Sequence, residues 1–179
     1  DYGNRVLYLV GEAGDDEQSI IERCRIAYGG QTSEVNDPSG GGTLLATSYN
    51  IYRYNEHVRC YLYGLYIDDN HAGVSSPADS NAVYNNSFWY CGYYEGSAAP
   101  ENKANFGDHW THAIVVDERD GDSKDNIIGN NVFWDNNNQQ VANEDIIEGY
   151  DGSGWSVPDL QDIRGNWYGK DGDPKWIDI

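Results

Sequence analysis

A repeated pattern of asparagine and hydrophobic residues constrains the fold of this chain more than any other feature. The segments NAVYNNSFWYCG (residues 81–92) and NIIGNNVFWDNN (residues 126–137) align as N-x-[VI]-x-N-N-x-F-W. SIIERCRIAYGG (residues 19–30) follows the same hydrophobic pattern, and DIRGNWYG (residues 162–169) is a degenerate copy. Self-similarity of this kind is typical of proteins built from stacked repeats.

The repeat unit extends to the hydrophobic segment before each full copy. GLYIDD (residues 64–69) leads to the first copy, and AIVVDE (residues 113–118) leads to the second. Each strand would have about four to six residues, and no amphipathic helix separates the strands. Consecutive parallel strands must then be joined by short turns, so we expect an all-β chain that forms a parallel β-helix.

The paired asparagines predict the conformation of the turns. Asparagine tolerates the left-handed conformation, and its amide can stack on the same residue of the next coil. We therefore expect ladders of stacked amides at the two pairs, Asn85–Asn86 and Asn130–Asn131.

The length of the chain suits one domain. With 179 residues, 39% of them hydrophobic, we treat residues 1–179 as a single β-helix domain and as a segment of a longer secreted protein. Roughly 22–25 residues per coil would give six to eight coils. Three polar segments break the repeat and are expected to form side loops that build binding surfaces. They are residues 31–43, 93–108 and 142–158.

The net charge limits the choice of partners. The chain carries 30 acidic and 11 basic residues, for a formal net charge of −19. Such a surface repels nucleic acid and anionic membranes, so we expect neither as a direct partner, and no segment suited to membrane insertion was found. The same acidity also fits a simple need for solubility.

The cysteines fit no metal-binding spacing. One disulfide with one free thiol and three buried thiols are both compatible with the sequence, and buried thiols are favoured. The three residues are Cys24, Cys60 and Cys91.

Three motifs together resemble a known superfamily. GLYIDD, the N-N-x-F-W coils and the segment GNWYGKDGDPKWID (residues 165–178) are similar to the secreted right-handed parallel β-helix proteins of the pectate-lyase-like superfamily. The similarity covers most of residues 19–178. It implies a right-handed β-helix with side loops and a secreted, extracellular location. Members include polysaccharide lyases, glycoside hydrolases, viral depolymerases and non-catalytic surface proteins, so the resemblance specifies fold better than activity.

The acidic pairs are the candidate catalytic residues. If GLYIDD and AIVVDE occupy the same side of nearby coils, Asp68 aligns with Asp117 and Asp69 aligns with Glu118. Adjacent strands are about 4.8 Å apart, so the aligned acids would be about 5 Å apart across one coil or about 10 Å across two. Glycosidase carboxylates are roughly 5 Å apart in retaining enzymes and 6.5–9.5 Å apart in inverting ones. Aspartates also cap turns at strand ends or bind Ca²⁺, and this structural interpretation is equally supported.

A metal site is a weaker prediction. DERDGDSKDN (residues 117–126) offers oxygen ligands for Ca²⁺, with Asp120, Asp122 and Asp125 as candidates. The spacing is not that of an EF-hand loop, and a solvated turn explains it as well. The glycosidase chemistry itself requires no cofactor.

Aromatic residues are the second signal for sugar binding. They make up 13% of the chain, and sugar rings pack their C–H faces on such side chains. Phe88 and Phe133 occupy equivalent repeat positions, so we expect them in the interior. The candidates for substrate binding are Tyr66, Trp89, Tyr93, Trp110, His112, Arg59 and Arg119.

Two functions follow from these patterns. The first is a secreted carbohydrate-active or carbohydrate-binding domain, glycoside hydrolase-like, with a polysaccharide as partner. A lyase is less favoured, because so few basic residues are present to hold an anionic sugar. The alternative is a non-catalytic segment of a surface layer, appendage or phage fibre, which would assemble end to end or as a homo-oligomer through its open coil ends.

Overall fold

The structure is a computed structural model. It describes residues 6–10, 18–29, 41–60, 63–68, 78–92, 112–117, 124–134, 136, 147–150, 155–156, 161–169 and 175–176. These residues form strands and turns, without any α-helix in the described ranges. The strands are β1 (Leu7–Val10), β2 (Ile20–Glu22), β3 (Arg25–Ala27), β4 (Thr43–Ala46), β5 (Ile51–Arg53), β6 (Glu56–Val58), β7 (Tyr63–Ile67), β8 (Ala82–Tyr84), β9 (Ser87–Trp89), β10 (His112–Asp117), β11 (Ile127–Gly129), β12 (Val132–Trp134), β13 (Ile147–Tyr150), β14 (Trp155–Ser156), β15 (Asp162–Arg164), β16 (Trp167–Gly169) and β17 (Lys175–Trp176).

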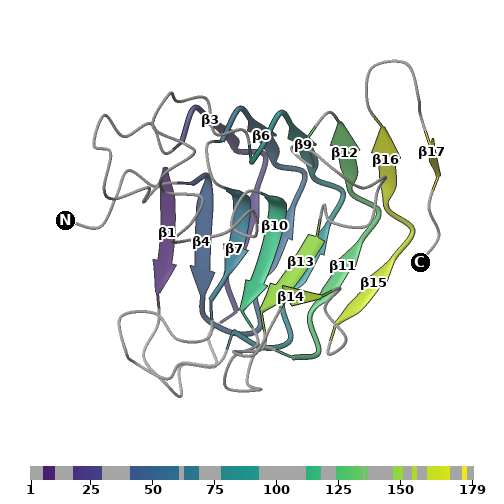
Figure 1. The fold of residues 1–179 in the computed structure, drawn as a ribbon. Coiled ribbons are helices and arrows are strands. Elements are labelled where there is room, and N and C mark those ends of the chain that lie inside the picture. Colours follow the sequence, from purple (N-terminus) through teal and green to yellow (C-terminus); the bar gives the residue numbers. More distant parts are fainter. Residues whose placement is uncertain are drawn as a thin grey trace.

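The strands form three sheets, and each pass of the chain contributes one strand to each sheet (Figure 1). Sheet A has the order β1-β4-β7-β10-β13-β14, sheet B the order β15-β11-β8-β5-β2, and sheet C the order β17-β16-β12-β9-β6-β3. Neighbouring strands are parallel, except that β14 and β17 pair antiparallel with their neighbours. The prediction of an all-β chain of parallel strands is confirmed, and the arrangement is consistent with a parallel β-helix.

Fewer coils are present than we expected. Within the described ranges the chain passes through the three sheets five times, against an expected six to eight. The connections between passes are longer than the repeat alone requires. Equivalent asparagines are 31 residues apart for Asn50 and Asn81, but 45 residues apart for Asn81 and Asn126.

One hydrophobic core lies between the three sheets. Leu65 of sheet A, Tyr52 and Val83 of sheet B, and Phe88 and Phe133 of sheet C are all completely buried in it. The rings of Phe88 and Phe133 stack with their centroids 5.1 Å apart. The prediction that these two phenylalanines fill the interior is confirmed.

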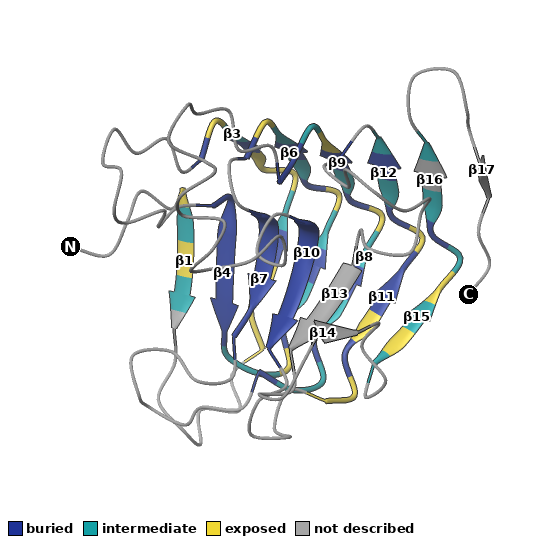
Figure 2. Ribbon diagram, in the orientation of Figure 1, coloured by how far each residue is buried: buried dark blue, intermediate teal, exposed yellow. Residues whose placement is uncertain are grey.

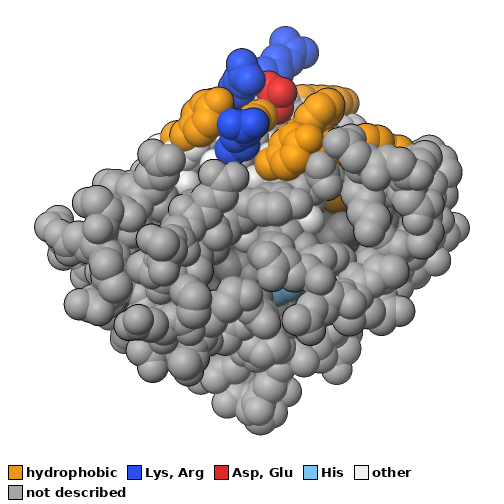
Figure 3. Space-filling model, turned by 45° about the horizontal axis from the view of Figure 1, so that its top comes forward, with side chains coloured by type: hydrophobic (Ala, Val, Ile, Leu, Met, Phe, Trp, Pro, Cys, Tyr) orange, Lys and Arg blue, Asp and Glu red, His pale blue; other side chains and the backbone are white. Residues whose placement is uncertain are grey.

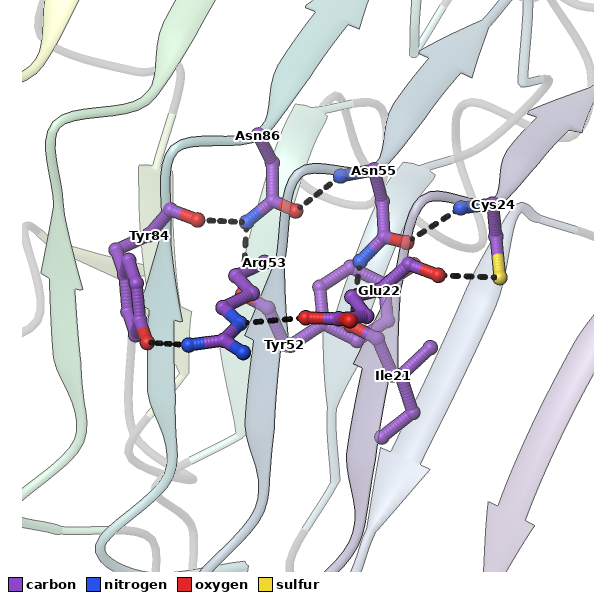
Figure 4. Close-up of polar contacts among 8 residues, drawn as sticks. All are labelled: Ile21, Glu22, Cys24, Tyr52, Arg53, Asn55, Tyr84 and Asn86. Carbon is purple, nitrogen blue, oxygen red and sulfur yellow. Dashed lines mark hydrogen bonds and ion pairs between the residues drawn. The ribbon is translucent and has the colours of Figure 1, made fainter.

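A ladder of stacked amides marks the turn between sheets B and C (Figure 4). The Oδ1 atom of Asn86 accepts a hydrogen bond from the backbone N–H of Asn55 at 2.9 Å, and its Nδ2 donates to the carbonyl of Tyr52 at 2.9 Å. On the other side, the backbone N–H of Asn86 donates to Asn131 Oδ1 at 2.9 Å. Each amide thereby satisfies backbone groups that the sharp turn removes from the sheet ladders. We call this the asparagine ladder; it consists of Asn55, Asn86, Asn131 and Asn166, and it ends at Cys24, whose backbone N–H donates to Asn55 Oδ1.

The residue before each ladder amide is left-handed. Asn85 has φ 56° and Asn130 has φ 53°, which confirms the predicted turn conformation. Arg23 and Tyr54 hold the same conformation at equivalent positions, with φ 57° and 55°. Since neither residue is an asparagine, the left-handed position of this turn does not require that residue type.

No helix among the described residues has the length and hydrophobicity needed to cross a membrane.

Candidate functional site

Sheet A differs from the other two sheets because its central strands are buried on both faces. Every residue of β4, β7 and β10 is buried, whereas β5 and β8 alternate between buried and partly exposed residues (Figure 2). The inward side chains of sheet A join the main core, and side chains on its outward face form a second cluster. We call this second group the outer cluster; it consists of Leu44, Ala46, Tyr63, Tyr66 and Val115.

Asp68 and Asp117 extend this outward face at the ends of two neighbouring strands. Strands β7 and β10 pair with Ile67 opposite Val116, so the residues that follow, Asp68 and Asp117, occupy the same position on adjacent strands. The register therefore places the two acids one coil apart, at the shorter of the two predicted spacings, about 5 Å. Asp68 is 4% exposed and Asp117 is completely buried.

A tyrosine positions one of the two carboxylates. Tyr66 lies on β7, two residues before Asp68, and therefore on the same face. Its hydroxyl donates a hydrogen bond of 2.7 Å to Oδ2 of Asp117 on the neighbouring strand. Because Tyr66 is only 5% exposed and packs in the outer cluster, its ring cannot move freely, and the hydrogen bond holds Asp117 in one orientation.

Two more side chains with ionisable groups lie at the start of the same strands. His112 begins β10 and pairs with Tyr63, which begins β7. The rings of Tyr63 and Tyr66 are 5.3 Å apart between centroids. Both His112 (5% exposed) and Tyr63 (3% exposed) are buried. Asp68, Asp117 and the hydroxyl of Tyr66 thus gather near one end of the two strands, where the carboxylates can transfer protons and stabilise a developing positive charge. His112 and Tyr63 lie at the other end, because a rise of about 3.3 Å per residue puts His112 roughly 16 Å along β10 from Asp117.

Two predicted sugar-binding residues lie elsewhere, at the outer face of sheet C. Trp89 ends β9 and is 42% exposed. The backbone N–H of Arg59 donates to the Trp89 carbonyl at 2.8 Å, and the Arg59 guanidinium lies 5.9 Å from the centre of the Tyr90 ring. In the view of Figure 3, hydrophobic and charged side chains gather at the upper edge. Trp89 in sheet C and Arg59 in the turn after β6 are separate from the acidic pair of sheet A.

One further predicted residue that the structure describes, Asp125, does not join the acidic pair. Asp125 is an exposed, left-handed residue (φ 56°) in the turn before β11. Among the residues that the structure describes, no group of three or more His, Cys, Asp or Glu side chains is arranged to hold a metal ion, so the Ca²⁺ site stays a prediction. The other predicted residues lie outside the described ranges: Asp69, Glu118, Tyr93, Trp110, Arg119, Asp120 and Asp122.

Sequence reasoning missed a groove on sheet B. This groove has a volume of about 450 Å³ and is lined in part by Tyr84, Gly129 and Arg164. These three residues occupy the same position on successive strands, and Gly129 leaves a gap because it has no side chain. The glycine of NIIGNN could have predicted this groove, because the other copies of the repeat carry large side chains at that position.

Sequence reasoning also missed one copy of the repeat, and it did not select Tyr63 of the outer cluster. NIYRYNEHVRC (residues 50–60) has the same N-x₄-N-x₄-C spacing as residues 81–91 but lacks the F-W pair. Tyr63 belongs to the group of aromatic residues around the first acidic pair, but its sequence context offered no reason to select it for substrate binding.

The comparisons with known proteins add no relative. No protein-family model, no curated protein and no solved structure matches the chain.

Proposed function

We propose that the chain is a secreted carbohydrate-active domain on a right-handed parallel β-helix of the pectate-lyase-like kind, and that it hydrolyses a neutral polysaccharide. The observation that carries the proposal is the pair Asp68 and Asp117, which the register puts at the same position on adjacent strands. A spacing of about 5 Å matches the carboxylate separation of retaining glycosidases.

Right-handedness is supported by a general rule of parallel sheets. Each pass from β4 to β7 leaves sheet A, crosses sheets B and C, and returns to a parallel neighbour. Crossover connections between parallel strands of one sheet are right-handed in nearly all proteins, because of the right-handed twist of the strands. The motifs shared with the pectate-lyase-like superfamily point in the same direction.

The proposed roles of the two acids follow from their surroundings. Asp117, oriented by the Tyr66 hydroxyl, attacks the anomeric carbon and forms a covalent glycosyl-enzyme, while Asp68 protonates the departing glycosidic oxygen. Asp68 then removes a proton from the water that hydrolyses this intermediate. His112 begins the same strand as Asp117, and we assign it to a sugar hydroxyl. Trp89 and Arg59 would bind the polymer at a distance from the reacting bond.

One observation favours the non-catalytic alternative. Asp68 is 4% exposed and Asp117 is completely buried, whereas a substrate must reach at least one oxygen of each. In a structural segment, the same carboxylates would serve only as hydrogen-bond acceptors inside the outer cluster. The deciding measurement is therefore turnover.

Substitution of each acid tests the proposal directly. We expect Asp68→Asn and Asp117→Asn each to lower kcat/KM on a panel of neutral glycans by at least about 10³-fold, because each removes an essential group. In Asp117→Gly, added azide should restore turnover and give a glycosyl azide, which identifies Asp117 as the nucleophile. The matched control is Asp125→Asn, an exposed acid whose left-handed conformation asparagine tolerates.

Two results would count against the proposal. Unchanged turnover in both asparagine variants would remove the acids from the chemistry. Absence of turnover by the unaltered protein on every glycan, with the fold intact by circular dichroism, would favour the structural alternative.

A further inference from the structure

A second buried cluster of reactive groups lies at the turn from sheet C to sheet A. At this turn Gly29, Cys60, Cys91 and Asn136 occupy equivalent positions on successive coils. Arg59 and Tyr90, which precede the two cysteines, are both left-handed, with φ 51° for each. The backbone N–H of Gly92 donates to the carbonyl of Cys60 at 2.9 Å. Cys60 and Cys91 are therefore direct neighbours on adjacent coils.

Equivalent side chains at these turns touch each other. In the other turns the amide of one coil reaches the amide of the next, as Asn86 Nδ2 donates to Asn131 Oδ1 at 3.0 Å and Asn50 Nδ2 to Asn81 Oδ1 at 3.0 Å. At the third turn two consecutive coils carry thiols in place of amides. Adjacent strands about 4.8 Å apart place the two Cα atoms inside the range that a disulfide spans, roughly 4.4–6.8 Å.

A histidine lies beside the two thiols. His57 is completely buried, and its Nε2 shares a hydrogen bond of 2.8 Å with the hydroxyl of Tyr52. Its other nitrogen, Nδ1, makes no hydrogen bond in this structure. A Cβ built on Gly42 would lie 2.9 Å from His57 Nδ1 and 2.9 Å from Cys60 Sγ, so both atoms border the same small space.

These neighbours make the two thiols unequal. The hydrogen bond from Cys91, followed by the interaction with His57, lowers the pKa of Cys60 below its ordinary value. Burial, followed by the hydrogen bond to Cys60, raises the pKa of Cys91. In the packed protein Cys60 is thus the thiol that loses its proton first, and the thiolate is the form that attacks a disulfide.

We propose that Cys60 and Cys91 are joined by a disulfide that cross-links two consecutive coils, formed by exchange with a disulfide oxidant. One of the two cysteines, as its thiolate, attacks one sulfur of the oxidant RSSR and releases RS⁻. The sulfur of the other cysteine then attacks the first in the mixed disulfide and releases the second RS⁻. The two cysteine protons end on the two released thiolates, so one RSSR is reduced to two RSH for each disulfide formed.

The burial of both sulfurs decides when the exchange takes place. Cys60 and Cys91 are 0% exposed, so an oxidant reaches them only before these coils have packed. The cross-link therefore forms during folding, in an oxidising environment, and is afterwards shielded from reduction. Cys24 lies on the first coil and is exposed, so the expectation of three buried thiols is wrong for this residue. With Cys60 and Cys91 joined, no other cysteine of the chain is left to pair with it.

Mapping of the thiols in the unaltered full chain tests the proposal. The reduced, denatured protein is refolded in a buffer of reduced and oxidised glutathione, then denatured without reductant and treated with N-ethylmaleimide. We expect Cys24 alone to be labelled, and a peptide that links Cys60 to Cys91 to be found by mass spectrometry. Labelling of all three cysteines, or a bridge that involves Cys24, would overturn the proposal.

Thermal unfolding gives a second measurement. Addition of reductant to the unfolded protein, followed by refolding, should lower Tm by about 10 °C, because the cross-link closes a long loop in the unfolded chain. Cys60→Ser and Cys91→Ser should lose this sensitivity to reductant, and Cys24→Ser should retain it. Equal Tm values for the oxidised and reduced unaltered protein would also contradict the cross-link.

Discussion

The asparagine ladder and the outward face of sheet A are both products of the same repeat, yet they differ in what their polar groups do. In the ladder, each buried amide is bonded to backbone groups that the turn would otherwise leave unpaired, as Asn86 is to Asn55 and Tyr52. On sheet A, the buried hydroxyl of Tyr66 is bonded to another side chain, Asp117. Ladder amides complete the backbone hydrogen bonding, whereas the bond from Tyr66 to Asp117 on sheet A joins two side chains.

This difference teaches how to separate structural from functional polar residues in a repeat protein. Polar residues that recur on every coil and bond to the backbone are required by the geometry of the turn. Asp68 and Asp117 occur on two adjacent coils only, opposite Ala46 and Tyr150 in the same row. Four substitutions would test whether this distinction holds.

The largest loss of stability is expected in the ladder. Asn86→Ala leaves the backbone N–H of Asn55 and the carbonyl of Tyr52 without their partner in a buried turn, so the free energy of unfolding should fall by about 3 kcal/mol. Urea unfolding monitored by circular dichroism measures it. Asn85→Gly is the control, since Asn85 is exposed and left-handed, and its effect should stay within about 0.5 kcal/mol. A loss below about 1 kcal/mol in Asn86→Ala would contradict the structural role.

A smaller loss of stability is expected from a substitution in the main core, at Tyr52 of sheet B. Tyr52→Phe removes the hydrogen bonds to Thr43 Oγ1 (2.9 Å) and His57 Nε2 (2.8 Å), so at pH 7 the free energy of unfolding should fall by about 2 kcal/mol. Tyr54→Phe, at an exposed position, is the control and should change little.

The same substitution should change the response to alkali. Burial raises the pKa of Tyr52 above its ordinary value, so above about pH 10 the unfolded chain loses this proton while the folded protein keeps it. The stabilising contribution is fully present below that pH and is lost as the pH rises. The stability of the Tyr52→Phe variant should therefore fall less steeply between about pH 10 and 11 than that of the unaltered protein. The two slopes should differ by up to about 1.4 kcal/mol per pH unit. Equal slopes in both proteins would contradict this expectation.

Substitution of Asp117 on sheet A should not lower the stability, in contrast to Asn86→Ala in the ladder. Asp117→Asn keeps an acceptor for the Tyr66 hydroxyl and removes a buried charge, so the free energy of unfolding should stay the same or rise by about 1 kcal/mol. The same variant should lose turnover, as proposed above. A fall as large as that of Asn86→Ala would mean that the acid is structural, and the contrast between the two regions would fail.

The smallest effect is expected at the surface of sheet B. Arg53 Nε lies 2.7 Å from Glu22 Oε2, and both side chains are about a third exposed, at 31% and 33% (Figure 4). Glu22→Gln should lower the free energy of unfolding by about 0.5 kcal/mol, and the difference should vanish in about 1 M salt. Glu56→Gln, in the more exposed pair with Arg25, should have still less effect. A loss that persists in high salt would show that the pair acts through packing.

The sequence alone determined the all-β parallel fold and its turns. Phe88 with Phe133 and Asn86 with Asn131 were matched by pattern, and each pair proves to be in register. This succeeds because the repeat is local: a strand of three residues, one left-handed residue and one stacking amide recur within eleven residues, as in residues 81–91. The expected number of coils exceeds the five within the described ranges, because the repeat carries no information about the length of the segments between its copies.

Only the tertiary structure decided which side chains meet on sheet A and inside the core. The spacing of Asp68 and Asp117 had two solutions in the sequence, and the pairing of β7 with β10 selected one. The bond from Tyr66 to Asp117 and the proximity of His57 to Cys60 join residues whose sequence context shows no relation. The physical reason is that contacts between coils depend on how strands stack after insertions of different length, and hydrophobic periodicity within one coil does not encode that stacking.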